Sequence, residues 1–220
     1  MIIAIDGPAG AGKSTVAKMV AKDLGFIYLD TGAMYRALTL KVIEEKINPL
    51  DTERIIQLAR DTDIDLKNDA GGALKVFLGG RDVSGQIREP RITKLVSDIA
   101  KIKEVRQVML GLQRRLGRQG NSILDGRDIG TVVFPDADKK FYLDAHPEER
   151  VKRRHKELLE LGQNIASHEV AEDIKNRDTI DSTRAVAPLK KAEDAIYIDT
   201  TAMTIEEVVK VVLNHIRRNG

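Results

Sequence analysis

Cysteine is absent from this 220-residue sequence. The chain therefore has neither a disulfide framework nor a thiolate metal site, which fits the reducing cytoplasm, where we expect the protein to reside. Long apolar runs are missing too, since none approaches the roughly 20 residues of a membrane-spanning helix. The first residues lack the charged region of a secretory signal, so we expect neither export nor a membrane partner.

An excess of charge of one sign is also missing. The 36 lysines and arginines nearly balance the 34 aspartates and glutamates, for a net charge of +2. A general nucleic-acid binder carries a strongly basic surface, so we expect no nucleic-acid partner. Any site for an anion must come from local clusters of arginine. Nothing marks a large exposed apolar face, so we expect a monomer.

The composition that is present is globular, with 42% hydrophobic and 32% charged residues. Short apolar runs suited to buried strands alternate with amphipathic helical segments. Strands are expected at 2–5, 26–29, 122–124, 140–143 and 195–198. Helices are expected at 14–24, 33–45 (capped by Thr31), from 51 or 52 to 60, 91–100, 103–118, 147–161, 168–178 and after a capping box of Thr204 and Glu207. This alternation predicts an α/β fold whose parallel sheet is covered on both faces.

One stretch departs from the alternation. Residues 64–66 and 74–78 have the pattern of short strands around a turn at 68–72, and Gly79 and Gly80 turn the chain again toward 81–83. The pattern predicts a small antiparallel insertion and not another unit of the main sheet.

The most informative segment is the glycine-rich run at 7–14, which fits G-x-x-x-x-G-K-[ST] between a predicted strand and a predicted helix. In that setting backbone N–H groups converge on phosphate at the helix N-terminus. Lys13 reaches the β- and γ-phosphates, and the Ser14 hydroxyl ligates Mg²⁺. The residues expected at ATP are Gly7, Pro8, Ala9, Gly10, Ala11, Gly12, Lys13, Ser14 and Thr15. The chain is predicted to bind a nucleoside triphosphate.

Such a loop occurs in kinases, in GTPase switches and in NTPase motors or regulators. The guanine-reading motif N-K-x-D does not occur in the sequence, which argues against a GTPase. A motor or regulator needs partner-facing machinery that 220 residues hardly accommodate. Separate clusters of arginine favour a kinase, because phosphoryl transfer is catalysed mainly by positioning and by cations.

Strand 122–124 leads into Asp125, Arg127 and Asp128 at the carboxyl edge of the predicted sheet, where open α/β folds bind ligands. Asp125 is placed to orient the water ligands of Mg²⁺, and Arg127 to hold an anionic acceptor, although a plain loop ion pair explains them as well. Two further clusters have helical spacing: Arg150, Arg153 and Arg154, and Arg177, Asp181 and Arg184. Both can equally be solvated, salt-bridged helix faces. Gly162 separates two helical segments that can close as a lid and exclude water.

Histidine is scarce, and none of the four stands near the predicted site in the sequence. A hydroxyl acceptor usually needs a general base. A phosphate acceptor is largely deprotonated near neutral pH and needs cations instead. The sequence therefore favours a phosphate acceptor, with Asp30 and Asp128 left open as bases for a hydroxyl.

In five segments the chain resembles the bacterial cytidylate kinase family, nearly from end to end. These are 5–14, 29–36, 82–88, 125–135 and 184–189. The resemblance implies transfer of phosphate from ATP, with Mg²⁺, to CMP or dCMP, on a three-layer P-loop fold with strand order 2-3-1-4-5. It also implies a core at about 1–60, 89–146 and 179–220, an acceptor-binding insertion at about 61–88 and a lid at about 147–178. The alternatives are a kinase for UMP or another small acceptor such as shikimate, and a non-catalytic NTP-binding regulator.

The resemblance assigns residues to each part of the reaction. It places Arg36, Arg127 and Arg184 on the acceptor phosphate, Thr31, Arg177 and Asp181 on the sugar, and Ser97, Arg106 and Asp128 on the base. It implies catalytic roles for Lys13, Arg127, Arg153, Arg154 and Arg184, with Arg153 at the adenine side of ATP. It puts Mg²⁺ at Ser14 and, through water, at Asp125.

The chemistry of cytosine agrees with the last part of this assignment. Cytosine presents an amino donor beside ring acceptors, so a carboxylate next to hydroxyl and guanidinium donors complements it. Uracil would turn an oxygen toward the carboxylate and leave two acceptors facing each other.

Overall fold

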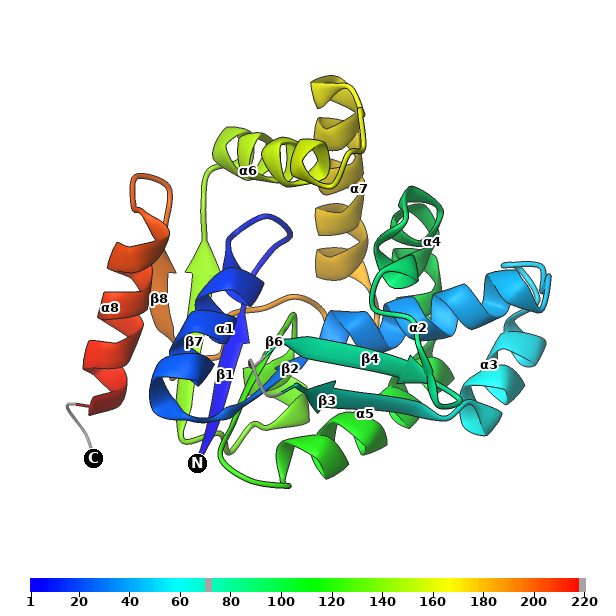
Figure 1. Cartoon of the computed structure of the whole chain (residues 1–220), viewed down its shortest axis with the longest axis horizontal. Helices are drawn as coiled ribbons and strands as arrows, with labels where there is room; N and C mark the ends of the chain where they lie inside the picture. The colour runs from blue at the N-terminus through cyan, green and yellow to red at the C-terminus, as the bar shows by residue number, and fades with distance from the viewer. Residues whose placement is uncertain (70–72, 218–220) are drawn as a thin grey trace.

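The computed structural model describes residues 1–69 and 73–217 (Figure 1). The last three residues of the turn predicted at 68–72 lie outside these residues. The main sheet has five parallel strands in the order β2-β6-β1-β7-β8. Their bounds are β1 (Ile2–Asp6), β2 (Ile27–Asp30), β6 (Ser122–Gly126), β7 (Lys139–Asp144) and β8 (Ile196–Asp199). Numbered among themselves, these strands have the predicted order 2-3-1-4-5, which is confirmed.

Both faces of this sheet are buried. On the central strand, Ile3 and Ile5 pack into one apolar cluster and Ala4 into the other, as the two-residue period of a strand requires. The first cluster is covered by α1 (Lys13–Leu24) and α8 (Ile205–Arg217). The second includes residues of α2 (Thr31–Glu44), α3 (Thr52–Asp61), α4 (Pro90–Ala100) and α5 (Lys103–Gly117). The result is the predicted three-layer arrangement (Figure 1).

The insertion is a separate antiparallel sheet in the order β3-β4-β5, as predicted. Its strands are β3 (Ile64–Asn68), β4 (Leu74–Leu78) and β5 (Arg81–Asp82), followed by the short helix η1 (Gln86–Arg88). Apolar side chains of β3 and β4 join the same core cluster as α2. The insertion is thereby anchored to the helix that follows the second strand of the main sheet.

Two helices stand beyond the carboxyl ends of the strands, α6 (Pro147–Glu160) and α7 (Ser167–Thr183) (Figure 1). They share a small apolar cluster of their own, made by Leu158, Val170 and Ile174. The helix α7 continues to Thr183 and does not end at 178 as predicted, so Asp181 is a helical residue. None of the helices in residues 1–69 and 73–217 is long and apolar enough to cross a membrane.

The capping predictions had different outcomes. The reciprocal bonds between Thr204 and Glu207 ahead of α8 are confirmed, at 2.8 and 3.2 Å. The prediction that Thr31 caps the second helix is wrong. Asp30 is the cap and accepts the Ala33 N–H at 3.0 Å. The Thr31 hydroxyl donates instead to the carbonyl of Asp125 at 2.7 Å, because β2 lies beside β6.

Candidate functional site

The glycine loop joins β1 to α1 at the carboxyl edge of the sheet. Its first residue, Gly7, has φ +145°, and a Cβ there would lie 1.9 Å from the carbonyl oxygen of Leu143 on β7. Only glycine can therefore enter the loop at this point. Gly12, the N-cap of α1, has a left-handed backbone conformation at φ 85°. No described side chain caps the first N–H groups of this helix. The first N–H groups of α1 thus point to the loop, as an anion site requires.

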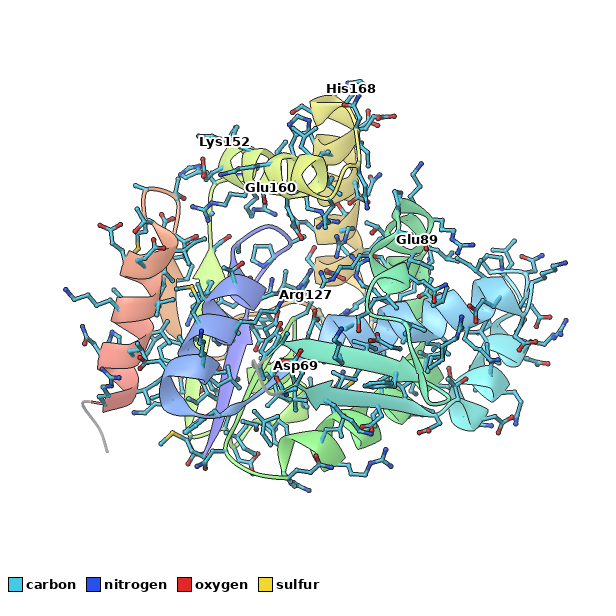
Figure 2. All side chains as sticks on the ribbon, in the orientation of Figure 1. Asp69, Glu89, Arg127, Lys152, Glu160 and His168 are labelled. Atoms are coloured by element: carbon cyan, nitrogen blue, oxygen red, sulfur yellow. The ribbon has the colours of Figure 1, made fainter. Side chains whose placement is uncertain are left out.

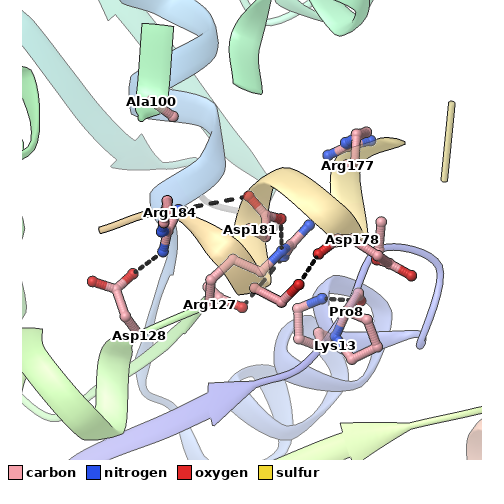
Figure 3. Close-up of polar contacts among 12 residues, drawn as sticks. Pro8, Lys13, Ala100, Arg127, Asp128, Arg177, Asp178, Asp181 and Arg184 are labelled. Carbon is pink, nitrogen blue, oxygen red and sulfur yellow. Dashed lines mark hydrogen bonds and ion pairs between the residues drawn. The ribbon is translucent and has the colours of Figure 1, made fainter. Parts of the chain in front are cut away.

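Lys13 is buried at the start of α1, and its Nζ donates to the carbonyl of Pro8 at 2.7 Å (Figure 3). Burial, followed by the nearby Arg127, lowers the pKa of Lys13 to about 7. A phosphate group in the loop would favour the charged amine again, because opposite charges attract strongly away from water.

Ser14 and Asp125 lie side by side across the sheet edge. The Ser14 hydroxyl donates to Asp125 Oδ2 at 2.7 Å, and the Tyr28 hydroxyl donates to Oδ1 at 2.8 Å. Burial and the neighbouring Asp30 raise the pKa of Asp125 to about 6. The Ser14 hydroxyl oxygen lies beside a carboxylate that lacks a full counter-charge. Oxygen ligands of this kind suit a hard cation such as Mg²⁺. No cluster of three or more potential metal-ligating side chains occurs among the described residues, so protein side chains alone do not form a complete coordination shell.

Beside the loop lies a cavity, and part of its wall is formed by arginines whose positive charge is not fully balanced by carboxylates. Arg36 donates to the Ile87 carbonyl at 3.2 Å and to the Thr93 hydroxyl at 2.9 Å. Desolvation, then Arg177 and Arg154, lower its pKa to about 9. Within the described part of the chain, the buried Nε atoms of Arg154 and Arg177 have no hydrogen-bond partner. The only ion pair of Arg177 there is with Asp173, at 3.9 Å. The cavity wall therefore favours an anion.

The remaining charges form a connected chain (Figure 3). Arg127 Nε donates to Asp181 Oδ2 at 2.8 Å, and Arg184 lies 3.6 Å from Asp181 and 3.4 Å from Asp128. Arg106 donates to the other oxygen of Asp128. Burial raises the pKa of Asp181, but Arg127 and Arg184 outweigh this effect and keep it below its usual value.

The wall around Asp128 is buried and polar. Ser97, Arg106 and Asp128 are each at most 8% exposed. The Arg106 guanidinium lies over the ring of Tyr35, 5.5 Å from its centroid, and its buried Nε has no partner among the described residues. A carboxylate, a hydroxyl and a guanidinium thus line the same cavity.

The structure brings together all of the predicted acceptor residues. One cavity is lined by Thr31, Arg36, Ser97, Arg106, Arg127, Asp128, Arg177, Asp181 and Arg184, together with Lys13, Ser14 and Asp125. Arg154 lines this cavity and the adjoining groove over the glycine loop. Arg153 lines the groove but not the cavity, and it donates to the Thr200 hydroxyl at 2.9 Å. Figure 2 shows Arg127 near the middle of the view and His168 at the outer end of α7.

Polar residues of the site outside the predicted set include Arg88, Tyr35 and Arg150. Arg88 and Tyr35 line the cavity, and Arg150 donates to the Ala9 carbonyl of the loop at 3.1 Å and to Asp178 of α7. Arg88 ends the segment 82–88 that carries the resemblance, which is a signal that could have identified it. The spacing of Arg150 marks it only as a helical neighbour of Arg153. Its contact with the loop depends on how α6 packs.

Comparisons with known proteins agree with this geometry. The family model for cytidylate kinase matches residues 3–218. The curated cytidylate kinase of Caldanaerobacter subterraneus subsp. tengcongensis is 54% identical over 217 residues, 99% of this chain and 95% of that protein. That of Clostridioides difficile is 52% identical over 216 residues, 98% of each chain. A solved structure, an uncharacterized protein from Eubacterium ventriosum, has a TM-score of 0.55 at 12% identity, covering 99% of this chain and 98% of its own. That likeness supports the fold alone.

Proposed function

The chain belongs to the cytidylate kinase family, and we propose that it transfers the γ-phosphoryl group of ATP to CMP and dCMP. One observation carries the proposal: a single cavity joins the glycine loop, an arginine-lined wall and the buried Asp128. The loop suits the donor, the arginines suit the phosphate of an acceptor, and Asp128 suits the amino group of cytosine. The products are ADP and CDP or dCDP.

ATP would occupy the groove over the loop. The N–H groups of 7–15 would hold its phosphates, and Lys13 would sit at the β- and γ-phosphates. Arg153 and Arg154 line that groove from α6, and the hydrogen bond from Arg153 to Thr200 would hold Arg153 at the adenine side. Arg154 also lines the acceptor cavity, so it would follow the transferred group between the two nucleotides.

We propose that Mg²⁺ binds with ATP at Ser14, with Asp125 holding a coordinated water. When bound, the ion neutralises the charge of the phosphate oxygens. The adjacent hydroxyl and carboxylate support this placement, as does the raised pKa of Asp125, which a neighbouring cation would lower. The nucleotide phosphates and water would complete the coordination shell.

The acceptor would lie along the cavity with its phosphate toward Lys13. Arg36, Arg127 and Arg184 would bind that phosphate, Thr31, Arg177 and Asp181 the sugar, and Ser97, Arg106 and Asp128 the base. Because the Thr31 hydroxyl already donates to the Asp125 carbonyl, it would meet the sugar as an acceptor. No general base is needed, since the attacking phosphate oxygen is deprotonated near neutral pH.

The division of the chain is part of the same proposal. Residues at about 61–88 would form the acceptor-binding insertion, those at about 147–178 a lid, and the rest the core. The separate apolar cluster between α6 and α7 supports a lid that moves as a unit. Closure would exclude water, which otherwise competes as the acceptor. The cytoplasmic location and the monomeric state stay predictions from the sequence.

The test is a coupled assay of ADP release with Mg-ATP and CMP, dCMP, UMP, AMP or GMP in separate reactions. We expect CMP and dCMP to exceed the other acceptors by about 10²-fold or more, because two wrong base contacts act together. Equal activity with UMP would favour the alternative of a broader pyrimidine kinase. ATP binding without transfer to any of the five would contradict the proposal.

A further inference from the structure

Asp6 is a buried carboxylate for which the proposed reaction has no use. It ends β1, directly before the first glycine of the loop, and is 5% exposed. Its two oxygens accept the N–H groups of Ile129, at 2.8 Å, and Gly130, at 2.7 Å. Burial nevertheless raises its pKa to about 6. Since a buried carboxylate stabilises a fold poorly, its position calls for a role beyond stability.

The two N–H groups belong to the residues that follow Asp128. They open η2 (Ile129–Val133), a π-helical turn in which the Asp128 carbonyl accepts from Val132 and Val133 at 2.9 and 3.1 Å. Asp128 itself has φ −146° and ψ 25°, a backbone conformation that belongs to neither strand nor helix. The peptide groups that follow Asp128 therefore form hydrogen bonds with Asp6 and within the turn, and not within a strand or an α-helix.

The surrounding packing makes this connection rigid. β6 pairs with β1 so that Gly126 lies beside Asp6. A Cβ at Gly126 would come within 2.7 Å of both the Ile129 side chain and the Thr31 hydroxyl. A Cβ at Gly130 would lie 3.1 Å from the side chain of Lys140. The turn thus packs closely against its neighbours, and the carboxylate of Asp6 holds its first two N–H groups.

We propose that Asp6 is the positioning residue for Asp128, and that it thereby sets the preference for cytosine over uracil without touching the acceptor. The inference rests on the proposed function. Hydrogen bonds weaken steeply when distance and angle depart from their optimum, so a small displacement of the Asp128 backbone would misalign its carboxylate with the base. The central strand that begins the phosphate loop would thus also orient the base-reading residue.

The experiment compares kcat/KM for CMP and for UMP in the wild type and in Asp6→Asn. An asparagine oxygen can accept one N–H, while its amide nitrogen opposes the other. We expect the CMP-to-UMP ratio to fall by about tenfold or more, in the range of a lost base contact. The change should lie in the KM for CMP. The ratio cancels any effect on ATP binding or on the amount of folded enzyme, because both acceptors share these.

Asp138→Asn is the matched control. Asp138 accepts the N–H of Ile2 at 2.6 Å, so it performs the same kind of carboxylate-to-backbone bonding at the opposite end of β1. Its loss weakens the anchoring of the strand but does not reach Asp128. The ratio should remain that of the wild type.

The outcomes separate the two proposals. A wild-type enzyme without preference for CMP would overturn the proposed function itself. A wild type that prefers CMP, together with an unchanged ratio in Asp6→Asn, would overturn only the role of Asp6. If Asp6→Asn does not fold, Asp6→Glu keeps the charge but moves both oxygens by a methylene, and the same fall in ratio is expected. If neither variant folds, Asp6 belongs to the fold and the inference is wrong.

Discussion

At the residue scale, the site is organised by which charges are compensated within the protein. Asp128 and Asp181 each have arginine partners, and Arg184 lies within 3.6 Å of both. Arg36 and Arg177 have their pKa values lowered by desolvation and by neighbouring arginines. In the proposed reaction, Asp128 would recognise the base and Asp181 the sugar, whereas Arg36 would gain its counter-charge when the acceptor phosphate binds.

Replacing Asp128 tests the base-reading role directly. In Asp128→Asn the amide can donate to the O4 of uracil, so we expect the kcat/KM ratio of CMP to UMP to fall by about 5- to 150-fold, equivalent to 1–3 kcal/mol. Steady-state kinetics with both acceptors measure the ratio. Asp194→Asn, which removes an exposed carboxylate paired with Lys140, is the control. An unchanged ratio in Asp128→Asn would remove Asp128 from base recognition.

Lys13 offers a test of the donor side. Lys13→Met keeps the length of a buried side chain but removes its charge, so we expect a stable protein whose kcat falls by about 10²- to 10³-fold, the cost of one electrostatic contact to the reacting group. The coupled assay and a urea melt measure the two effects. Lys22→Met, in the exposed last turn of the same helix, should leave turnover unchanged. Turnover near that of the wild type in Lys13→Met would exclude the loop lysine from the mechanism.

At the scale of elements, α6 is the connection between the loop and α7. Arg150, in the first turn of α6, donates to the Ala145 carbonyl at 3.0 Å, to the loop carbonyl of Ala9 and to Asp178. A Cβ at Gly10 would lie 2.9 Å from the Arg150 carbonyl oxygen, so the helix and the loop are in direct contact. The bases of the two proposed lid helices are therefore joined to the donor loop by one guanidinium.

Removing that guanidinium should cost stability. Arg150→Met leaves the Ala9 and Ala145 carbonyls without this donor, at about 1–3 kcal/mol for each buried group that stays unpaired. The free energy of unfolding in urea measures the loss. Lys156→Met, on the same helix and 3.9 Å from Glu160 at the surface, should change it by about 0.5 kcal/mol or less. Equal effects of the two substitutions would contradict the connecting role of Arg150.

At the scale of the whole molecule, the central strand carries a pH-dependent contribution to stability. The pKa of Asp6 rises from 3.8 to about 6 on folding, so the folded state binds the proton more tightly than the unfolded state. Between these two values the contribution of Asp6 to the free energy of unfolding must increase as pH falls, by about 3 kcal/mol in total. Above pH 6 the ionised, buried carboxylate is a cost that lowers stability.

Urea unfolding of the wild type and of Asp6→Asn between pH 4 and pH 7 checks the sign. Other titrating groups act in both proteins and cancel in the difference. We expect the wild type to gain stability relative to Asp6→Asn as the pH falls through about 6, in line with the pKa shift. A difference independent of pH would show that Asp6 has an ordinary pKa in the folded protein.

The sequence by itself determined the features that local spacing encodes. The glycine loop with Lys13 and Ser14, the alternation of strands and helices, and the antiparallel insertion depend on residues close together along the chain. Tertiary structure alone decided which charged residues meet. Spacing could not separate Arg154, which lines the acceptor cavity, from Arg153, which does not. It also could not place Asp6 beside Ile129, because 123 residues separate them and only the pairing of β1 with β6 brings them together.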